Sequence, residues 1–204
     1  MFGYQFKTFM PTKKLLEAYR LFDKANSLDP NLETVNGDTI PKELIYGQRM
    51  TQTLESFNQD ASEALRLAAR SQHICRWEIP RSSYPMDRVG YLKWREDLKK
   101  FHAAKASEIL DSLDYDIETI ERVSFLLQKK KLKKDEETQA LEDIICLVFL
   151  TYYYEDFLSK HKNEKVIDIL QKTWRKMSEK GQQAALKGSY SKKALDLIQQ
   201  ALAS

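Results

Sequence analysis

Apolar residues recur at every third or fourth position along most of the chain, while strict alternation of apolar and polar residues is almost absent. The first spacing places apolar side chains on one face of a helix, and the second is typical of strands. The pattern therefore predicts an all-α fold, organised as a single-domain helical bundle.

Proline, glycine and capping residues divide this pattern into separate helices. Pro30 stops the first helix, and residues 31–40 are predicted to be a loop. Asp60 followed by Glu63 forms a capping pair that opens the third helix, which has to end before Pro80. Helices are predicted at about residues 12–27, 41–57, 60–77, 87–110, 116–130 and 135–160, in a segment containing residues 166–177, and at 191–203.

Two of these segments are especially apolar or regular. The helix at 135–160 has apolar residues on all sides around its centre, which predicts a place in the middle of the bundle. The helix containing Val166 to Met177 carries one continuous apolar stripe. The longest uninterrupted apolar run of the chain, from Ile144 to Leu150, is too short to cross a membrane, so no membrane partner is expected.

The composition is typical of a folded, soluble protein. Of 204 residues, 42% are apolar and 31% are charged, and a net charge of +3 does not by itself indicate nucleic-acid binding. Cys75 and Cys146 have no CxxC spacing, so we expect no disulfide or zinc framework and a cytoplasmic location. Residues 1–9 lack the features of a signal peptide and are predicted to be an N-terminal extension of a domain at 10–204.

Positive charge is concentrated in one segment. Residues 66–95 contain six of the ten arginines and Lys93, against Glu78 and Asp87, which gives this segment a net charge of +5. It also contains two of the three tryptophans. Guanidinium groups bind phosphate or carboxylate with paired hydrogen bonds, and a tryptophan ring can stack on a base. An anion-binding pocket is predicted here, with these candidate contacts: Arg70, Arg76, Trp77, Arg81, Trp94 and Arg95.

The predicted helix at 60–77 would align several of these residues on one face. A plain solvated face would mix Lys and Glu, whereas this stripe contains only Arg, His and Trp. The structural alternative stays open, because a single His packs in a core more often than it binds a ligand, and arginines near Glu78 and Asp87 can form ion pairs. The stripe consists of Arg66, Arg70, His73 and Trp77.

Three groups could bind a metal ion if the fold brings them together: His73, His102 and the pair Glu142-Asp143. Two imidazoles and a carboxylate suit Mn, Fe, Ni or Zn, with water completing the shell. Asp143 lies in the most apolar helix, where an unpaired buried carboxylate is costly, so it needs a cation or several hydrogen-bond donors. An arginine partner would meet this need as well as a metal ion.

Motifs of several other function classes are absent from the sequence. It contains no GxSxG, GxxxxGK[ST], GxGxxG or HExxH, so serine hydrolases, P-loop ATPases, Rossmann dehydrogenases and zincin proteases are not supported. The run from Lys129 to Lys134 is followed by acidic residues, and we interpret it as a solvated turn rather than as a nucleic-acid patch.

Five long motifs run from Ala69 to Arg81, Gly90 to Arg95, Leu98 to Ala103, Gln139 to Leu150 and Lys172 to Ser178. Together they resemble an uncharacterised family, catalogued as domain of unknown function forty-two-oh-two. The resemblance covers the chain from about residue 10 to its end. It implies no established activity.

More distantly, the chain resembles a degenerate HD domain, the all-helical metal-dependent phosphohydrolase superfamily whose ligands are a His, a His-Asp pair and a later Asp. Tyr46 stands in the place of the first His, Gln72-His73 in that of the pair, and Asp143 in that of the later Asp. His102 resembles an additional His of some members. The resemblance implies an HD-like fold with His73, His102 and Asp143 as catalytic or metal-binding residues, although the first His and the Asp of the pair are replaced.

Two functions follow as hypotheses. The first is a divergent HD-like hydrolase of a phosphorylated small molecule or nucleotide, in which a metal-bound water attacks and arginines offset the charge on phosphate. The alternative is a non-catalytic nucleotide- or RNA-binding module that has lost the metal ligand set. A third hypothesis is a helical interaction protein that uses the stripe from Val166 to Met177 or the run Tyr152-Tyr153-Tyr154.

Overall fold

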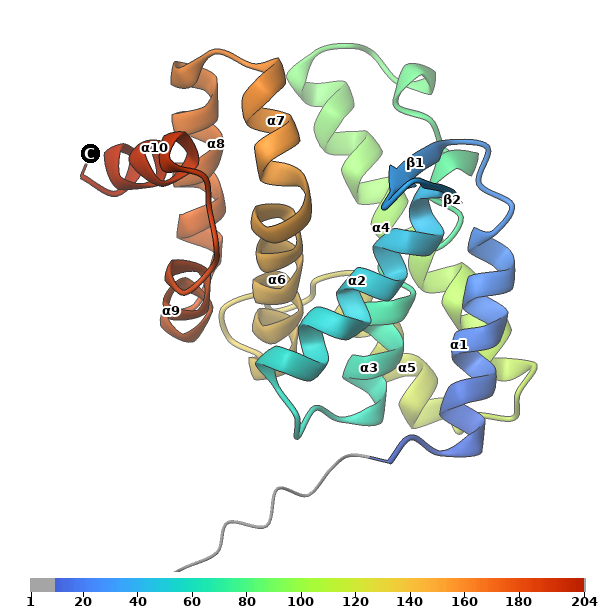
Figure 1. Cartoon of the computed structure of the whole chain (residues 1–204). Coiled ribbons are helices and arrows are strands. Elements are labelled where there is room, and N and C mark those ends of the chain that lie inside the picture. Colours follow the sequence, from blue (N-terminus) through green and yellow to red (C-terminus); the bar gives the residue numbers. More distant parts are fainter. Residues whose placement is uncertain (1–9, 204) are drawn as a thin grey trace, which may run out of the picture. The chain divides into compact units, whose positions relative to one another are not determined.

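The computed structural model describes residues 10–203 and is mostly helical with one small β-hairpin, so the predicted all-α fold is confirmed (Figure 1). Backbone contacts divide the chain into two compact units, residues 1–128 and residues 129–204. The predicted N-terminal extension, residues 1–9, lies outside the described residues. The proposed domain limits at residues 10 and 204 stay a prediction.

Unit 1 contains α-helices, a β-hairpin and two short 3-10 turns, in the order α1 (Lys13–Asn26), β1 (Leu32–Val35), β2 (Asp38–Pro41), α2 (Lys42–Phe57), α3 (Glu63–Arg70), η1 (Arg76–Glu78), η2 (Arg81–Ser83), α4 (Arg88–Asp111) and α5 (Ile117–Leu127). The residue before each of α1, α3, α4 and α5 caps that helix, because its side chain accepts a hydrogen bond from a backbone N–H of the first turn. α3 contacts α1, α2 and α5, and α4 packs along α5. Their shared core includes the fully buried Phe22, Met50 and Leu65.

The predicted loop at residues 31–40 is wrong, because most of it forms the hairpin of β1 and β2. The two strands pair antiparallel, with Val35 opposite Asp38. Asn36 and Gly37 both have positive φ, 52° and 92°, as a tight hairpin turn requires. Asp29 fixes the end of the hairpin, since its carboxylate accepts hydrogen bonds from the backbone N–H of Asn31 and of Glu43.

The predicted helix at 60–77 is also too long, because α3 ends at Arg70. Ser62, rather than Asp60, caps its start. Beyond the helix, Cys75 adopts a left-handed conformation with φ of 51°, and its N–H donates to Asn26 Oδ1 at 3.0 Å. The chain therefore turns between residues 71 and 75, and the predicted single-helix stripe through His73 and Trp77 does not form.

Unit 2 contains α6 (Glu136–Val148), a π-helical turn (Phe149–Tyr153), α7 (Tyr154–Lys160), α8 (Asn163–Lys176), α9 (Glu179–Leu186) and α10 (Lys192–Leu202). The predicted helix at 135–160 is thus interrupted by the π turn, and α9 was not predicted. The lysine run is a turn with mostly exposed side chains, as predicted. No helix in the described part of the chain is long and apolar enough to cross a membrane.

Candidate functional site

Glu43 and His73 form a carboxylate–imidazole pair in unit 1. Glu43 lies in the first turn of α2, and His73 lies on the turn after α3, with its Nδ1 3.2 Å from Glu43 Oε2. When Glu43 is ionised, its carboxylate only accepts hydrogen bonds, and His73 then donates to it from Nδ1. The side chain of Glu43 is 6% exposed and that of His73 is 24% exposed. The pair is therefore buried at the carboxylate and reaches the surface through the imidazole.

Tyr46 supports the ring of His73. The two rings are stacked, with centroids 4.1 Å apart and planes inclined by 11°. Tyr46 follows Glu43 by three residues, so both side chains lie on the same face of α2. One helix face thus contributes both the hydrogen-bond partner and the stacking partner of His73.

His102 of α4 lies behind this pair, its ring centroid 5.8 Å from that of His73. Its Nδ1 lies 2.8 Å from the carbonyl oxygen of Ile74 and must donate to it, because a carbonyl only accepts. Burial is the main reason that the pKa of His102 is lowered to about 3, and the neighbouring His73 lowers it further. His102 is therefore neutral at pH 7, and its buried Nε2 is an acceptor with no hydrogen-bond partner among the described residues.

Arg76 places a positive charge beside the carboxylate. Its guanidinium Nη1 is 3.6 Å from Glu43 Oε1, and the same guanidinium lies over the ring of Trp94 at 5.1 Å. Burial raises the pKa of Glu43, and Arg76 opposes that rise. The ring of Trp94 is fixed in turn, because its Nε1 donates to the carbonyl oxygen of Ile79 at 2.8 Å. These residues form the Glu43–His73 cluster: Glu43, Tyr46, His73, Arg76, Trp94 and His102.

Two of the other arginines in the basic segment hold the fold together. The side chain of Arg66 is fully buried, donates to the carbonyl oxygens of Gln59 and Ala61, and pairs with Glu55. Arg70 donates from Nε and Nη2 to the two carboxylate oxygens of Asp23, at 2.8 and 2.5 Å. Their guanidinium groups are engaged within unit 1.

The remaining predicted contacts lie on turns or on α4. Arg81 donates to the carbonyl oxygens of Tyr84 and Pro85, at 3.0 and 2.6 Å. Arg95 is half-buried, with its Nη1 3.3 Å from the hydroxyl of Tyr91. Trp77 is half-buried in η1. Among the predicted anion contacts, Arg76 and Trp94 are therefore the pair that the structure brings to the histidines.

Asp143 lies in unit 2. The sequence left two partners open for its carboxylate, a cation or several hydrogen-bond donors, and the structure shows several donors. Its carboxylate accepts hydrogen bonds from Ser178 N, Ser178 Oγ and Gln139 Nε2, at 2.7, 2.5 and 3.0 Å. Glu142 beside it pairs with Lys129. The residues described contain no group of three or more His, Cys, Asp and Glu side chains that could hold a metal ion. Asp143 and the two histidines belong to different units, so metal binding by the three stays a prediction.

A family model with the description "Domain of unknown function (DUF4202)" matches residues 16–198. The chain belongs to this family. The match extends over both units of the DUF4202 domain. No curated protein and no solved structure matches the chain.

Sequence reasoning missed Glu43, which connects the cluster of this DUF4202 domain. The available signal was a carboxylate in the first turn of a predicted helix, three residues before an aromatic ring. Such a carboxylate is ordinarily explained by the helix dipole alone. Its partner His73 lies 30 residues further on, and the turn that brings it close was not predicted.

Proposed function

We propose that this DUF4202 domain is a divergent relative of HD-domain hydrolases and hydrolyses a phosphorylated small molecule or a nucleotide at the Glu43–His73 cluster. The observation that supports the proposal is the contact between the Glu43 carboxylate and His73 Nδ1. The imidazole is partly exposed, and Arg76 lies beside the carboxylate. A base oriented by a second group is the usual arrangement for general acid–base catalysis.

In the proposed reaction His73 acts as the general base. A water molecule gives a proton to His73 Nε2 while its oxygen forms a bond to phosphorus. The phosphorus–ester oxygen bond breaks, and the same proton returns to the leaving oxygen. Glu43 keeps the proton of His73 on Nδ1 and stabilises the imidazolium, and Arg76 offsets the negative charge on the phosphate oxygens. These steps use the side chains of unit 1.

The positions that resemble HD ligands support the relationship. Tyr46, in the place of the first His, is stacked on His73, and His102 lies next to that ring. Gln72, in the other position of the pair, is 5% exposed, with a buried Oε1 that has no partner among the described residues. Buried acceptors without donors are costly, and a bound ligand or ion would satisfy them. In a metal-dependent form of the proposal, an ion such as Mn, Fe, Ni or Zn would bind at His73 and His102 and would supply an activated water.

A second candidate is a non-catalytic nucleotide- or RNA-binding module. The contact that favours it is the half-buried guanidinium of Arg76 over the ring of the buried Trp94, because this guanidinium offers hydrogen-bond donors to a phosphate. Tyr46 and Gln72 replace ligands of the HD pattern without removing this pair.

Hydrolysis of p-nitrophenyl phosphate and of a nucleotide panel tests the first candidate. The purified protein should release product, the His73→Asn variant should lose this activity, and the Glu43→Gln variant should retain a smaller part of it, while both keep their circular dichroism spectra. The assay is run on the protein as purified and after incubation with Mn, Fe, Ni or Zn. Elemental analysis of the unchanged protein and of the His73→Ala and Asp143→Ala variants shows whether binding of a metal depends on either residue. No product under any condition, with saturable binding of nucleotide or RNA lost in Arg76→Ala, would establish the binding module instead.

A further inference from the structure

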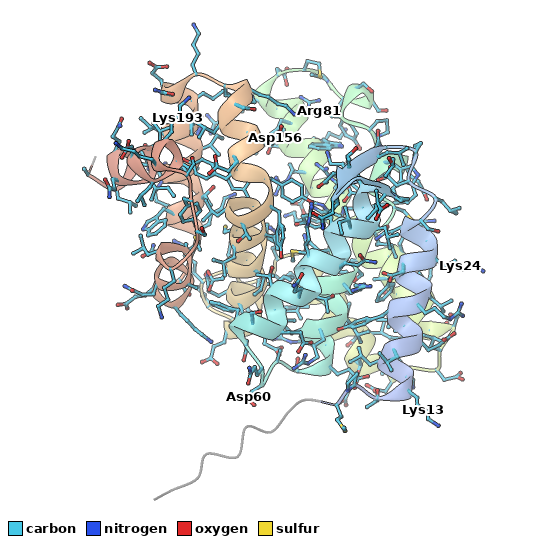
Figure 2. All side chains as sticks on the ribbon, in the orientation of Figure 1. Lys13, Lys24, Asp60, Arg81, Asp156 and Lys193 are labelled. Atoms are coloured by element: carbon cyan, nitrogen blue, oxygen red, sulfur yellow. The ribbon has the colours of Figure 1, made fainter. Side chains whose placement is uncertain are left out.

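The carboxamide of Asn26 connects two segments that carry the Glu43–His73 cluster. Asn26 is the last residue of α1 and is 2% exposed, and in Figure 2 Lys24 marks the end of α1 at which it lies. Its Nδ2 donates a hydrogen bond to the backbone carbonyl oxygen of Glu43 at 3.3 Å, and its Oδ1 accepts one from the backbone N–H of Cys75 at 3.0 Å. A carbonyl oxygen only accepts and an N–H only donates, so both contacts agree on the orientation of this amide.

The peptide group between Ile74 and Cys75 is held at both of its polar atoms. Its carbonyl oxygen accepts a hydrogen bond from His102 Nδ1 at 2.8 Å, and its N–H is the group that donates to Asn26. Cys75 has a φ of 51°, a left-handed conformation that is unfavourable for a residue with a Cβ. These two contacts therefore hold the chain in a turn that it would not adopt by itself. His73 directly precedes the peptide group, so the backbone from which its imidazole extends is fixed as well.

The backbone of Glu43 is held on its other side by Asp29. The carboxylate of Asp29, a residue that is 3% exposed, accepts a hydrogen bond from Glu43 N at 3.0 Å. The same carboxylate accepts two hydrogen bonds from Asn31, at 2.9 and 2.8 Å, which keep it in place. Because Asn26 binds the carbonyl oxygen of Glu43, both backbone polar groups of Glu43 contact side chains at or just beyond the end of α1.

We propose that Asn26 is a positioning residue, which sets the contact between the carboxylate of Glu43 and the imidazole of His73. These two side chains belong to different elements, 30 residues apart, and meet at 3.2 Å. Asn26 is bonded to the backbone of Glu43 itself and to the backbone two residues after His73. An apolar side chain of similar size would fill the same space without fixing the separation of the two backbones. This role rests on the proposed function only for its effect on catalysis.

Nuclear magnetic resonance of protein isotope-labelled at its histidine nitrogens tests the proposal without requiring activity. The chain has three histidines, and the signals of His73 are those missing from the His73→Asn variant. In the unchanged protein they should show one preferred tautomer, with the proton on Nδ1 when Glu43 is ionised. In Asn26→Leu this preference should be lost, because the carboxylate is no longer held against the ring. His161, whose Nδ1 contacts the carbonyl oxygen of Phe157 in unit 2, should keep its signals.

The same variant should lower kcat for p-nitrophenyl phosphate at least tenfold, because the base is no longer oriented. Thr138→Val is the matched control, since Thr138 is 1% exposed and its hydroxyl is 3.1 Å from Asp135 Oδ1 in unit 2. It also removes a buried hydrogen bond, so it should lower the melting temperature but leave kcat and the signals of His73 unchanged. Asn26→Ala removes the same two bonds without adding volume and repeats the test if the leucine variant does not fold.

Unchanged signals of His73 in a folded Asn26→Leu or Asn26→Ala protein would overturn the proposal, and so would an equal change in Thr138→Val. If the unchanged protein hydrolyses no substrate but the tautomer preference is lost in Asn26→Leu, the positioning role stands and the proposed hydrolysis fails. If hydrolysis is found and Asn26→Leu keeps its full kcat, the positioning role fails and the hydrolase proposal stands.

Discussion

The imidazole of His73 stacks on the phenol ring of Tyr46, with centroids 4.1 Å apart. The Nδ1 of the same imidazole contacts the carboxylate of Glu43, which precedes Tyr46 by three residues on α2. One face of α2 thus fixes both the orientation and the tautomer of an imidazole that belongs to a different element. A base held in this way needs little reorganisation before it accepts a proton. This relationship is the basis of the catalytic proposal.

Removing either partner of the pair should reduce hydrolysis without unfolding the protein. We expect His73→Asn to lower kcat by about 10²- to 10⁴-fold, the usual contribution of a general base. Glu43→Gln should lower it less, because His73 remains but its proton is no longer held on Nδ1. Steady-state kinetics with p-nitrophenyl phosphate measure both effects. Glu17→Gln, which removes the carboxylate of an exposed ion pair with Arg20, is the matched control and should leave kcat unchanged.

Two arginines of the basic segment should behave differently when substituted. Arg76→Ala should abolish binding of nucleotide, as should His73→Ala, and change the free energy of unfolding by no more than about 1–2 kcal/mol. Arg66→Met should cost about 3 kcal/mol or more, because it removes the donors to the carbonyl oxygens of Gln59 and of the buried Ala61 and the partner of Glu55. Isothermal titration calorimetry and urea unfolding of the variants separate the two effects. A severe loss of stability in His73→Ala would show that His73 is structural.

The sequence predicted helices best where the signal is local. Thr12, Asp87 and Asp116 cap α1, α4 and α5 through residues only a few positions away, and these helices begin where the pattern predicts. The hairpin has a local signal too, the Asn36-Gly37 turn, but its strands are too short for alternation to be convincing.

The part that could not be predicted depends on contacts between distant residues. The left-handed turn at Cys75 is held by Asn26, 49 residues earlier, and it ends the predicted stripe of α3. Without this turn His73 would not meet Glu43. The sequence therefore identified the histidines, Arg76 and Trp94 as candidates, but the carboxylate that connects them required the fold.

The buried histidine makes a pH dependence measurable. His102 titrates at about 6.5 in an unfolded chain and at about 3 in the folded one, so between these values the unfolded state binds more protons. Its contribution to stability is complete above pH 6.5 and is lost as the pH falls toward 3, by at most about 1.4 kcal/mol per pH unit. The raised pKa of Glu43 has the opposite effect on the pH dependence of stability, but Glu43 is present both in the unchanged protein and in a variant altered only at His102.

Urea unfolding of the protein and of His102→Gln, repeated between pH 4 and 7, measures this contribution. The difference in unfolding free energy between the two should shrink steadily as the pH falls below 6.5. A difference that does not depend on pH would show that His102 is not buried as a neutral imidazole.

The contact between Asp143 and Gly181 predicts a coupling between two positions of unit 2. A Cβ at residue 181 would lie 2.7 Å from Asp143 Cγ and Oδ1, and three hydrogen bonds from Ser178 and Gln139 hold that carboxylate in place. Gly181→Ala should therefore destabilise the protein by about 1–3 kcal/mol, although alanine is the better helix former. In the Asp143→Ala background the clash with Cγ and Oδ1 is gone and only the 3.1 Å approach to Cβ remains, so the same change should cost less than about 1 kcal/mol. Thermal unfolding of the two single variants and the double variant measures the coupling, and strictly additive effects would contradict it.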